Sequence, residues 1–518
     1  MPIDINYLRE YKKTDTSPNL VGSPQVFRDA QHMRGKDVGA VDRVIALDTE
    51  WRECTVRILG LKTDMNKVQK EEIAPKKKAK VQSDDEGLVE ALAKVQEIRK
   101  QVAALEATLP GMEAARDKEL GKIGNIVDPE VPFGTTDEED EKNLVVGLNP
   151  HPDGVELPCP CGQLKATPPP TKPLQHDDIL WRIGGYEPIR GANVAGHRGY
   201  FLTANGVLLN QAVIQFSIAF LGERGYMPLQ PPFMMNKDVM SGIAQLEDFD
   251  EQLYKVSGKT DDPTGESEKY LIATSEQPIC AYHKGDWLRE SEVPIRYTGI
   301  STCFRKEAGS SGKDIRGIFR VHQFEKIEQF VVTHDDLEES SKEQTRMKEA
   351  AEDFYKALGI PYRVVCLVSG ALNDAAIKKY DLEGWFPGQN AYRELVSCSN
   401  CTDFQSRSMG TRYGIKKQGQ ATASYCHFLN STLCATGRGI CAILENHQTE
   451  DYQGKGPGVV VPEALRNYMG GKDFLPFVRG PAEMTKGEKG KVKSQTKKDQ
   501  GKKGGDKKKA DVPPPAPK

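Results

Sequence analysis

The chain has 518 residues and a formal net charge of −3, from 71 basic and 74 acidic residues. This length allows two or three domains with a large core, and the near-neutral charge argues neither for nor against a nucleic-acid partner. The N-terminal stretch MPIDINYLRE lacks the apolar run of a secretory signal, and no stretch approaches the ~20 apolar residues of a membrane span. The 11 scattered cysteines, an odd number, are typical of reduced cytosolic thiols.

Two heptad patterns predict a long antiparallel helical hairpin between about residues 41 and 118. The first seam runs from Val44 to Val68 and the second from Ala91 to Met112, with apolar residues three and four apart in alternation. Each helix of ~30 residues would span ~45 Å. Pro110, followed by a glycine, lies inside the second seam, so we expect either a kink or an early end of that helix.

The turn between the two helices is predicted to be basic, because the first seam stops near Pro75 and lysines follow it. Pattern alone favours an ordinary dimerising coiled coil, whereas a basic tip favours contact with a polyanion. The lysines concerned are Lys76, Lys77, Lys78 and Lys80.

Residues 124–175 are interpreted as a connector. Cys159 and Cys161 within it have no second cysteine pair at zinc spacing, so we expect no zinc there. A long apolar helix is then predicted within residues 202–224, ended by Gly225. The run YMPLQPPFM follows, and its consecutive prolines predict an edge strand or a chain-crossing segment. Residues 255–269 read as a surface insertion.

The stretch from Gly299 to Phe330 predicts two strands, each with a polar face, joined by a long soft turn rich in glycine and serine. The first strand carries F-R-x-E and the second R-V-H-Q-F-x-K-x-E. A solvent-exposed sheet face would explain such a pattern. A nucleotide site would also explain it, since arginine offers a fork to phosphate oxygens and an aromatic ring stacks on a base.

Three further motifs carry candidate chemistry. Thr274 and Glu276, two residues apart, are expected to share one face of a strand upstream of this hairpin. Downstream, Glu394 and Ser397 are predicted on a strand, where a carboxylate and a hydroxyl can both reach a hard cation. Arg438 lies between two glycines at the start of a buried helix, and an arginine in so apolar a stretch is costly unless it meets an anion.

Cys398 and Cys401 form a C-x-x-C motif that would suggest a zinc or redox site. The motif has no partner C-x-x-C and no strand-to-helix redox context, so we interpret it as core packing. The tail from Ala482 carries twelve lysines and five acids, and we expect it to be disordered. Such a tail could be solubilising, attract RNA without specificity, or act as a targeting signal.

The order of these motifs resembles the class II aminoacyl-tRNA synthetases, and most closely the seryl-tRNA synthetase family. The long helix with Pro231-Pro232 resembles motif 1, the Gly299–Phe330 hairpin motif 2, and CHFLNSTLCATGRGICAILEN motif 3. The resemblance implies an α+β fold, with an antiparallel sheet flanked by helices and preceded by the coiled-coil arm. The implied division is an N-terminal tRNA-binding domain (1–123), the connector (124–175), a class II catalytic domain (176–480) and a disordered Lys-rich tail (481–518).

The implied function is ATP-dependent attachment of L-serine to tRNA(Ser), with tRNA(Sec) as a further substrate, through a seryl-adenylate. The resemblance also implies a cytoplasmic homodimer formed through motif 1, Mg²⁺ bound with ATP, no zinc and no membrane partner. Two alternatives remain. Another class II synthetase, such as the threonyl or prolyl enzyme, would carry a folded anticodon domain after motif 3. A non-catalytic tRNA-binding paralogue would be expected to lose a phosphate arginine, whereas Arg305 and Arg438 are both present.

Residue roles follow from the same resemblance. Arg305 and Arg438 are the implied catalytic residues, on the α-phosphate with the serine carboxylate and on the γ-phosphate respectively. Glu307 would meet the adenine amino group, and Phe324 would stack on the ring. The implied ATP-binding set is Arg305, Lys306, Glu307, Arg320, Val321, His322, Gln323, Phe324, Glu394, Leu395, Val396, Ser397 and Arg438. The implied serine-binding set is Thr274, Glu276, Arg305, Glu328, Asn430 and Thr432. Glu394 and Ser397 would hold Mg²⁺, and the four tip lysines would contact tRNA. Gly439 departs from the bulkier residue usual in motif 3.

Overall fold

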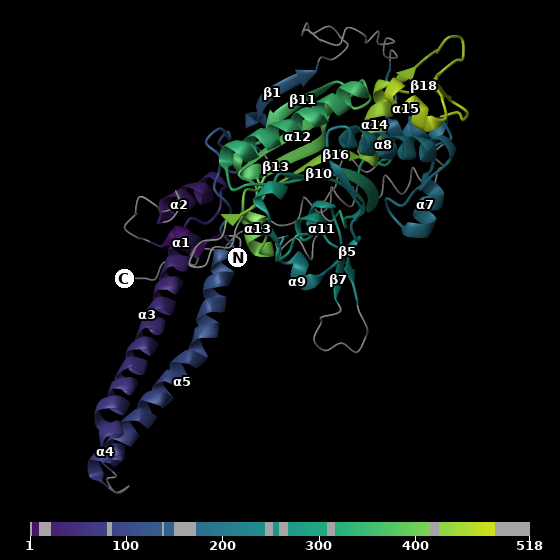
Figure 1. Ribbon diagram of the computed structural model, residues 1–518. Helices are drawn as coiled ribbons and strands as arrows, with labels where there is room; N and C mark the ends of the chain where they lie inside the picture. Colours follow the sequence, from purple (N-terminus) through teal and green to yellow (C-terminus); the bar gives the residue numbers. More distant parts are fainter. Residues whose placement is uncertain are drawn as a thin grey trace, which may run out of the picture.

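The computed structural model describes residues 3–9, 22–79, 85–136, 139–149, 172–243, 252–257, 268–307, 316–414 and 424–481. They form a body built around one large sheet and a two-helix arm that projects from it (Figure 1). The predictions for Lys80, for Cys159 and Cys161, for most of the motif 2 turn and for the C-terminal tail fall outside the described residues.

The arm is the predicted antiparallel hairpin. Its helices are α3 (Gly39–Val68) and α5 (Glu86–Leu120), which contact each other along their length, and α1 (Ile5–Leu8) and α2 (Pro24–Met33) pack at its root. Seam positions such as Val44, Ile58, Val95 and Val102 are at most 8% exposed. The heptad prediction is therefore confirmed.

The first arm helix does not stop at Pro75 as predicted. A π-helical turn, η1 (Gln69–Ile73), leads directly into α4 (Ala74–Lys78), so the three described tip lysines lie on a last helical turn. Pro75 is tolerated because it occupies the first turn of α4, where its missing N–H removes no hydrogen bond. Pro110 lies inside α5, which runs on to Leu120, so the second of the two alternatives, an early end of that helix, does not occur.

The body sheet has eight strands in the order β1-β11-β12-β13-β16-β10-β9-β4. All neighbours are antiparallel except β4 and β9, and β4 is the predicted edge segment beside the paired prolines. The opposite edge strand, β1, pairs with β11 and lies inside the stretch interpreted as a connector, where no strand was predicted. The bounds are β1 Leu144–Asn149, β4 Met227–Leu229, β9 Ile295–Phe304, β10 Gln323–Thr333, β11 Tyr362–Cys366, β12 Lys378–Phe386, β13 Ala391–Asn400 and β16 His427–Ala435.

Shorter elements surround this sheet. Residues 255–269, predicted as a surface insertion, begin in β6 and end in β7, and these two strands pair with each other. The remaining bounds are α6 His176–Arg182, β2 Tyr186–Glu187, α7 Pro188–Ala195, β3 Phe201–Leu202, β5 Met234–Asn236, α9 Lys237–Met240, β6 Lys255–Val256, β7 Lys269–Leu271, α11 Glu276–Cys280, β8 Trp287–Leu288, α13 Phe404–Met409, β14 Arg412–Tyr413, β15 Ser424–Tyr425, β17 Gln448–Thr449, β18 Gly458–Val460, α15 Glu463–Arg466 and β19 Phe474–Pro476.

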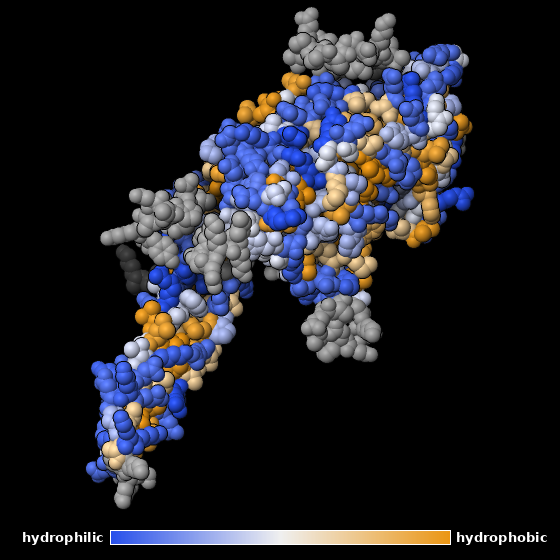
Figure 2. Space-filling view, in the orientation of Figure 1, coloured by the Kyte–Doolittle hydropathy of each residue, from blue (hydrophilic) through white to orange (hydrophobic). Residues whose placement is uncertain are grey.

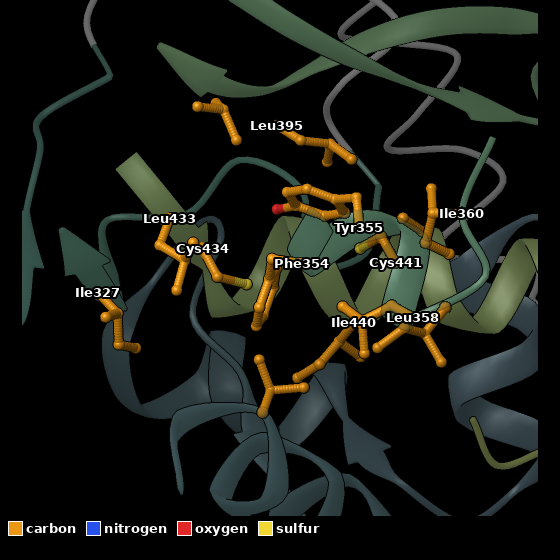
Figure 3. Close-up of a cluster of buried hydrophobic side chains, with 14 of the residues drawn as sticks. Ile327, Phe354, Tyr355, Leu358, Ile360, Leu395, Leu433, Cys434, Ile440 and Cys441 are labelled. Atoms are coloured by element: carbon orange, nitrogen blue, oxygen red, sulfur yellow. The ribbon is translucent and has the colours of Figure 1, made fainter. Parts of the chain in front are cut away.

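Three helices, α8 (Ala204–Gly222), α12 (Leu337–Ala357) and α14 (Thr436–Asn446), pack together against one face of the sheet. Phe216 of α8 stacks on Phe354 of α12 at 5.2 Å between ring centroids. Figure 3 shows Phe354 and Ile440 among side chains that also come from the strands, including Leu433. Because strand side chains alternate, this helix layer leaves the opposite face of the central strands for polar groups.

The sequence expectation that no segment approaches membrane-span length is wrong for α8. By length and composition alone, this 19-residue helix is long and apolar enough to cross a membrane. Half of its apolar 18-residue window is buried inside the body. Leu209, Val213 and Leu221 are at most 1% exposed in the main core, which accounts for its apolar sequence.

Candidate active site

The motif 2 strands present the predicted polar face. In the β9–β10 ladder, Cys303 lies opposite Phe324, Ser301 opposite Lys326 and Gly299 opposite Glu328. Partners directly opposite in a ladder share a face, so these side chains line one surface. The strands are shorter at the turn than predicted, because β9 ends at Phe304 and β10 begins at Gln323. Arg305, Glu307 and Arg320 therefore lie beyond the strand ends.

A hollow opens over this face. It collects much of the implied ATP-binding set, together with Thr432 of the serine set and five residues that the sequence did not single out. The predicted lining residues are Arg305, Glu307, Arg320, Val321, Phe324, Glu394, Leu395, Thr432 and Arg438. The additional ones are Ile318, Phe319, Lys326, Ala435 and Gly437.

Arg305 is held where the two ends of the motif 2 turn meet. Its backbone N–H donates to the His322 carbonyl at 2.9 Å, and His322 Nδ1 lies 2.9 Å from the Arg305 carbonyl oxygen. Tyr254 contacts the same imidazole nitrogen at 3.1 Å. The Arg305 guanidinium lies 5.4 Å from the Phe324 ring centroid and donates to the Ala273 carbonyl. His322 thus braces the turn from outside the hollow.

Glu307 has a φ of +51°, an uncommon conformation for a residue with a side chain. Its carboxylate lies 3.4 Å from the Arg320 guanidinium, across the mouth of the turn. Four other members of the predicted ATP set do not line the hollow, namely Lys306, Gln323, Val396 and Ser397. Lys306 donates its backbone N–H to Gln252, and Val396 is buried in the core.

A β-bulge explains how Glu394 and Ser397 come to share a face although they are three residues apart. On β12, Leu382 pairs with Val396 and the next residue, Glu383, pairs with Glu394, which leaves Leu395 as the extra residue. The extra residue shifts the alternation of side chains by one position, so Glu394 and Ser397 point to the same face of the sheet, the face of the site. Ser397 lies opposite Asp381.

This corner of the site is strongly charged. Burial raises the pKa of Asp381 to about 7. The Lys379 charge opposes this rise, and the Glu394 charge adds to it. Asp381 Oδ1 is buried and has no hydrogen-bond partner among the described residues. Burial alone would raise the pKa of Glu394, but the charges of Arg438 and Lys379 outweigh it and lower that pKa to about 2.

Arg438 projects from the first turn of α14, as predicted for motif 3. Its guanidinium lies 3.3 Å from the Glu394 carboxylate and donates to the Glu394 carbonyl at 3.0 Å. The structure also explains the unusual Gly439. A Cβ at that position would lie 2.7 Å from Cys434 Sγ, so the thiol occupies the space of a larger side chain.

Thr274 and Glu276 do not lie on a strand, contrary to the sequence prediction. They occupy a bend and the first residue of α11, because Ile272 ends the extended run and Ser275 precedes a helical turn. The turn nevertheless faces Glu328 of β10. Ser275 Oγ and the Glu276 backbone N–H donate to Glu328 Oε2 at 2.8 and 2.9 Å, and Thr274 Oγ1 donates to the same oxygen.

Two neighbouring carboxylates, the buried Glu328 and the half-buried Glu276, therefore differ in their chemistry. Burial would raise the pKa of Glu328, but the Lys326 ammonium and these hydroxyls lower it, so Glu328 stays charged. Burial, together with the Glu328 charge, raises the pKa of Glu276. Glu276 Oε1 accepts from Gln405 Nε2 at 2.9 Å and from Asn430 Nδ2 at 3.0 Å.

The described part of the chain holds no cluster of metal-ligating side chains. No group of three or more His, Cys, Asp or Glu side chains is placed there to hold a metal ion. Cys398 and Cys401 are buried free thiols, and burial raises the pKa of both. A buried protonated thiol packs as a small apolar group.

Two family models match the chain. The seryl-tRNA synthetase N-terminal domain covers residues 3–127, and the class II tRNA synthetase core domain (G, H, P, S and T) covers residues 254–447. A cytoplasmic serine--tRNA ligase of Schizosaccharomyces pombe is 48% identical over 91% of this chain and 97% of its own length. The chain belongs to the seryl-tRNA synthetase family. The cytoplasmic serine--tRNA ligase of Arabidopsis thaliana is 45% identical over 95% of this chain and 100% of its own.

Two solved seryl-tRNA synthetase structures match most of the chain. The cytoplasmic enzyme of Naegleria fowleri in complex with AMP matches with a TM-score of 0.76 and 43% identity, covering 92% of this chain and 99% of the other. The Pyrococcus horikoshii enzyme complexed with ATP matches with a TM-score of 0.77 and 36% identity, covering 92% and 100%. The structure confirms the α+β fold implied by the motifs. It has an antiparallel sheet flanked by helices, and the helical arm precedes this sheet in the chain.

Proposed function

We propose that this chain activates L-serine with ATP and transfers the seryl group to tRNA(Ser) through a seryl-adenylate. The observation that carries the proposal is the adjacency of the Glu276–Glu328 pair to a hollow containing Arg305 and Arg438. A small amino acid and a nucleotide would meet where these two regions join. The names of the cytoplasmic relatives support the same compartment for this chain.

The first step joins serine to the α-phosphate. A serine carboxylate oxygen attacks the α-phosphorus in line, a P–O bond forms, and the bond to the pyrophosphate oxygen breaks. No protein nucleophile is needed, so the protein contributes position and charge. Arg305 would hold the serine carboxylate and an α-phosphate oxygen, and Arg438 would hold the γ-phosphate at the other end. Phe324 would stack on adenine, and Glu307 would accept from its amino group.

Serine would be recognised by the two carboxylates. Glu328 is charged and would take the substrate ammonium together with Thr274. Glu276 would accept the hydroxyl hydrogen, with Thr432 beside it and Asn430 holding the carboxylate in place. The side-chain hydrogen bonds of Glu276 within the described part of the chain all fall on Oε1, and a serine hydroxyl would complete the set at Oε2.

Mg²⁺ with ATP fits the corner formed by Glu394 and Ser397. Asp381 Oδ1, opposite Ser397, is buried, accepts no hydrogen bond within the described part of the chain and lies 3.9 Å from Lys379 Nζ, so a hydrated cation could supply the hydrogen bond that it lacks. Glu394 and Ser397 would hold the ion, which would neutralise phosphate charge when bound. Glu394→Ala is expected to raise the Mg²⁺ concentration that half-saturates ATP binding. An unchanged concentration in calorimetric titrations would remove Glu394 from this role.

The arm would bind tRNA, with Lys76, Lys77 and Lys78 at its tip as phosphate contacts. The described elements up to Leu120 are all helices, and the arm projects from the body (Figure 1). Both observations support the proposed division into an N-terminal domain (1–123), a connector (124–175) and a catalytic domain (176–480). The experiment is charging of tRNA(Ser) and tRNA(Sec) transcripts with labelled serine. Seryl-tRNA(Ser) formation is expected, and its absence despite adenylate formation would overturn the transfer step. Formation of seryl-tRNA(Sec) in the same assay would make tRNA(Sec) a second substrate, and its absence would exclude tRNA(Sec).

A homodimer through motif 1 is proposed from exposed apolar side chains around α8 and the edge strand β4. Val207 and Leu208 of α8 are 41% and 40% exposed, Met227 of β4 49%, and Ile189 and Val194 of the neighbouring α7 51% and 75%. Figure 2 shows apolar side chains over the region of α7 and α8. Sedimentation of the wild type and of Leu208→Glu tests the interface, with a dimer expected only for the wild type.

A further inference from the structure

Phe319 lies where the returning arm of the motif 2 turn meets the phosphate end of the hollow. It is 6% exposed and contributes to the hollow's lining beside Arg438. The Arg438 guanidinium lies 4.9 Å from its ring centroid, and the Arg393 guanidinium lies 5.1 Å from it. One ring thus serves two arginines that come from different elements, α14 and β13.

The ring is fixed from behind by two other rings. Phe386 packs edge-on at 5.5 Å with an interplanar angle of 85°, and His176 lies at 6.3 Å. His176 is itself anchored to α14, because its backbone N–H donates to Glu445 Oε1 at 3.0 Å and its Nδ1 lies 2.9 Å from the same oxygen. The ring therefore cannot shift without disturbing buried partners.

The backbone before the ring is equally constrained. Gly317 has a φ of +68°, and a Cβ there would lie 2.4 Å from His176 Nε2. A Cβ at Gly437, next to Arg438, would lie 2.9 Å from the Ile318 carbonyl oxygen. Glycines at both positions allow the turn and α14 to approach closely enough for the ring to reach both guanidiniums.

Two guanidiniums in one place repel each other, and two groups nearby oppose this repulsion: the Glu394 carboxylate, 3.3 Å from Arg438, and the Phe319 ring, which contacts both cations. Burial, together with the Arg438 charge, lowers the pKa of Arg393, which is the signature of this crowding. The face of an aromatic ring carries negative potential and attracts cations within about 6 Å of its centroid. Phe319 meets that distance for both arginines. A polyanion in the hollow would be attracted by the same pair of charges.

We propose that Phe319 is a positioning residue that holds Arg393 and Arg438 together at the polyphosphate end of the ATP site. It would favour ligands that carry β- and γ-phosphates, including the pyrophosphate that leaves, over ligands that end at the α-phosphate. This inference rests on the proposed function, in which Arg438 receives the γ-phosphate.

The test compares ATP with AMP, since only ATP reaches the paired arginines. We would measure the Kd of each nucleotide by calorimetry, at fixed Mg²⁺, for the wild type, Phe319→Leu, Phe319→Met, Phe319→Tyr and Phe386→Leu. The Leu and Met variants lose the ring face, so their Kd for ATP is expected to rise about three- to thirtyfold. Their Kd for AMP should stay within about twofold of the wild-type value. Phe319→Tyr keeps the ring and should retain tight ATP binding. Phe386→Leu removes a ring that packs behind Phe319 and leaves the Phe319 ring itself in place, so it should weaken ATP binding less than Phe319→Leu, with AMP binding within about twofold of the wild type.

Several outcomes would overturn the proposal. Equal weakening of ATP and AMP in both apolar variants would mean that Phe319 only supports the fold, and no weakening of either would mean that the ring does not position the arginines. A larger loss of ATP selectivity in Phe386→Leu than in Phe319→Leu would also overturn the proposal, because the ring that contacts the guanidiniums would then not be the one that matters. Serine-dependent pyrophosphate exchange by the wild type, run in parallel, separates these failures from failure of the proposed function.

Discussion

Replacing Glu276 tests how the site distinguishes serine from alanine, which differ by one hydroxyl. The Glu276 carboxylate is held by Asn430 and Gln405 through one oxygen, and the serine hydroxyl would donate to the other. A hydrogen bond to a charged acceptor contributes about 1.5–3 kcal/mol, or roughly 10- to 150-fold in kcat/KM. Alanine leaves that buried acceptor unpaired, so the site rejects it by about this factor.

Glu276→Ala should therefore raise the serine KM and reduce the serine-over-alanine ratio of kcat/KM by about 10- to 100-fold. Glu276→Gln keeps the volume and a hydrogen-bonding end but removes the charge, so an intermediate ratio is expected. Thr432→Ala should narrow the ratio less than Glu276→Ala, because a neutral hydrogen bond contributes only about 0.5–1.5 kcal/mol.

The assay is ATP–pyrophosphate exchange with serine and with alanine on each variant, and the ATP KM serves as an internal control. The ATP KM should change little, since Glu276 does not line the hollow. If the serine-over-alanine ratio stayed the same in both Glu276→Ala and Thr432→Ala, the hydroxyl partners would be wrong. A large rise in the ATP KM would show instead that the substitution had disturbed the whole site.

Three further outcomes are expected. Arg305→Ala should slow pyrophosphate exchange by about 30- to 1,000-fold, because a lost charge contact to the transition state costs about 2–4 kcal/mol, while an unchanged rate would remove motif 2 from the mechanism. Lys77→Glu with Lys78→Glu should weaken tRNA binding and reduce its salt dependence without changing serine activation; Lys76 is spared because it pairs with Asp85. Joining Cys54 to Thr108 by a short turn should shorten the arm without disturbing its root, since their side chains touch at 4.0 Å. The shortened enzyme should activate serine but charge tRNA poorly, and equal loss of both in a folded protein would make the arm a folding element.

The elements that the sequence predicted well are those with a strong period or an unusual residue. The arm seams repeat over many turns, so burial of Val44 and Val102 followed from spacing alone. The paired prolines marked an edge strand, and Arg438 lies in the first turn of a buried helix as expected, while its contact with an anion stays a prediction. In each case one physical constraint was enough to decide the local structure.

Other features depend on tertiary contacts that no local pattern carries. Thr274 and Glu276 were expected on a strand, but their placement is decided by hydrogen bonds to Glu328, 52 residues or more downstream. The bulge that aligns Glu394 with Ser397 is visible only in the pairing of β12 with β13. Phe319 passed unnoticed, because one apolar residue in a turn gives no periodic signal.

The most direct test of the account is ATP–pyrophosphate exchange measured with a panel of amino acids that includes serine, alanine, threonine and proline. The account predicts exchange that requires an amino acid and is fastest with serine. Threonine, which keeps the hydroxyl but adds a methyl, should be refused by shape. Faster exchange with threonine or proline, or no exchange with serine by a protein that binds ATP, would contradict the proposed function.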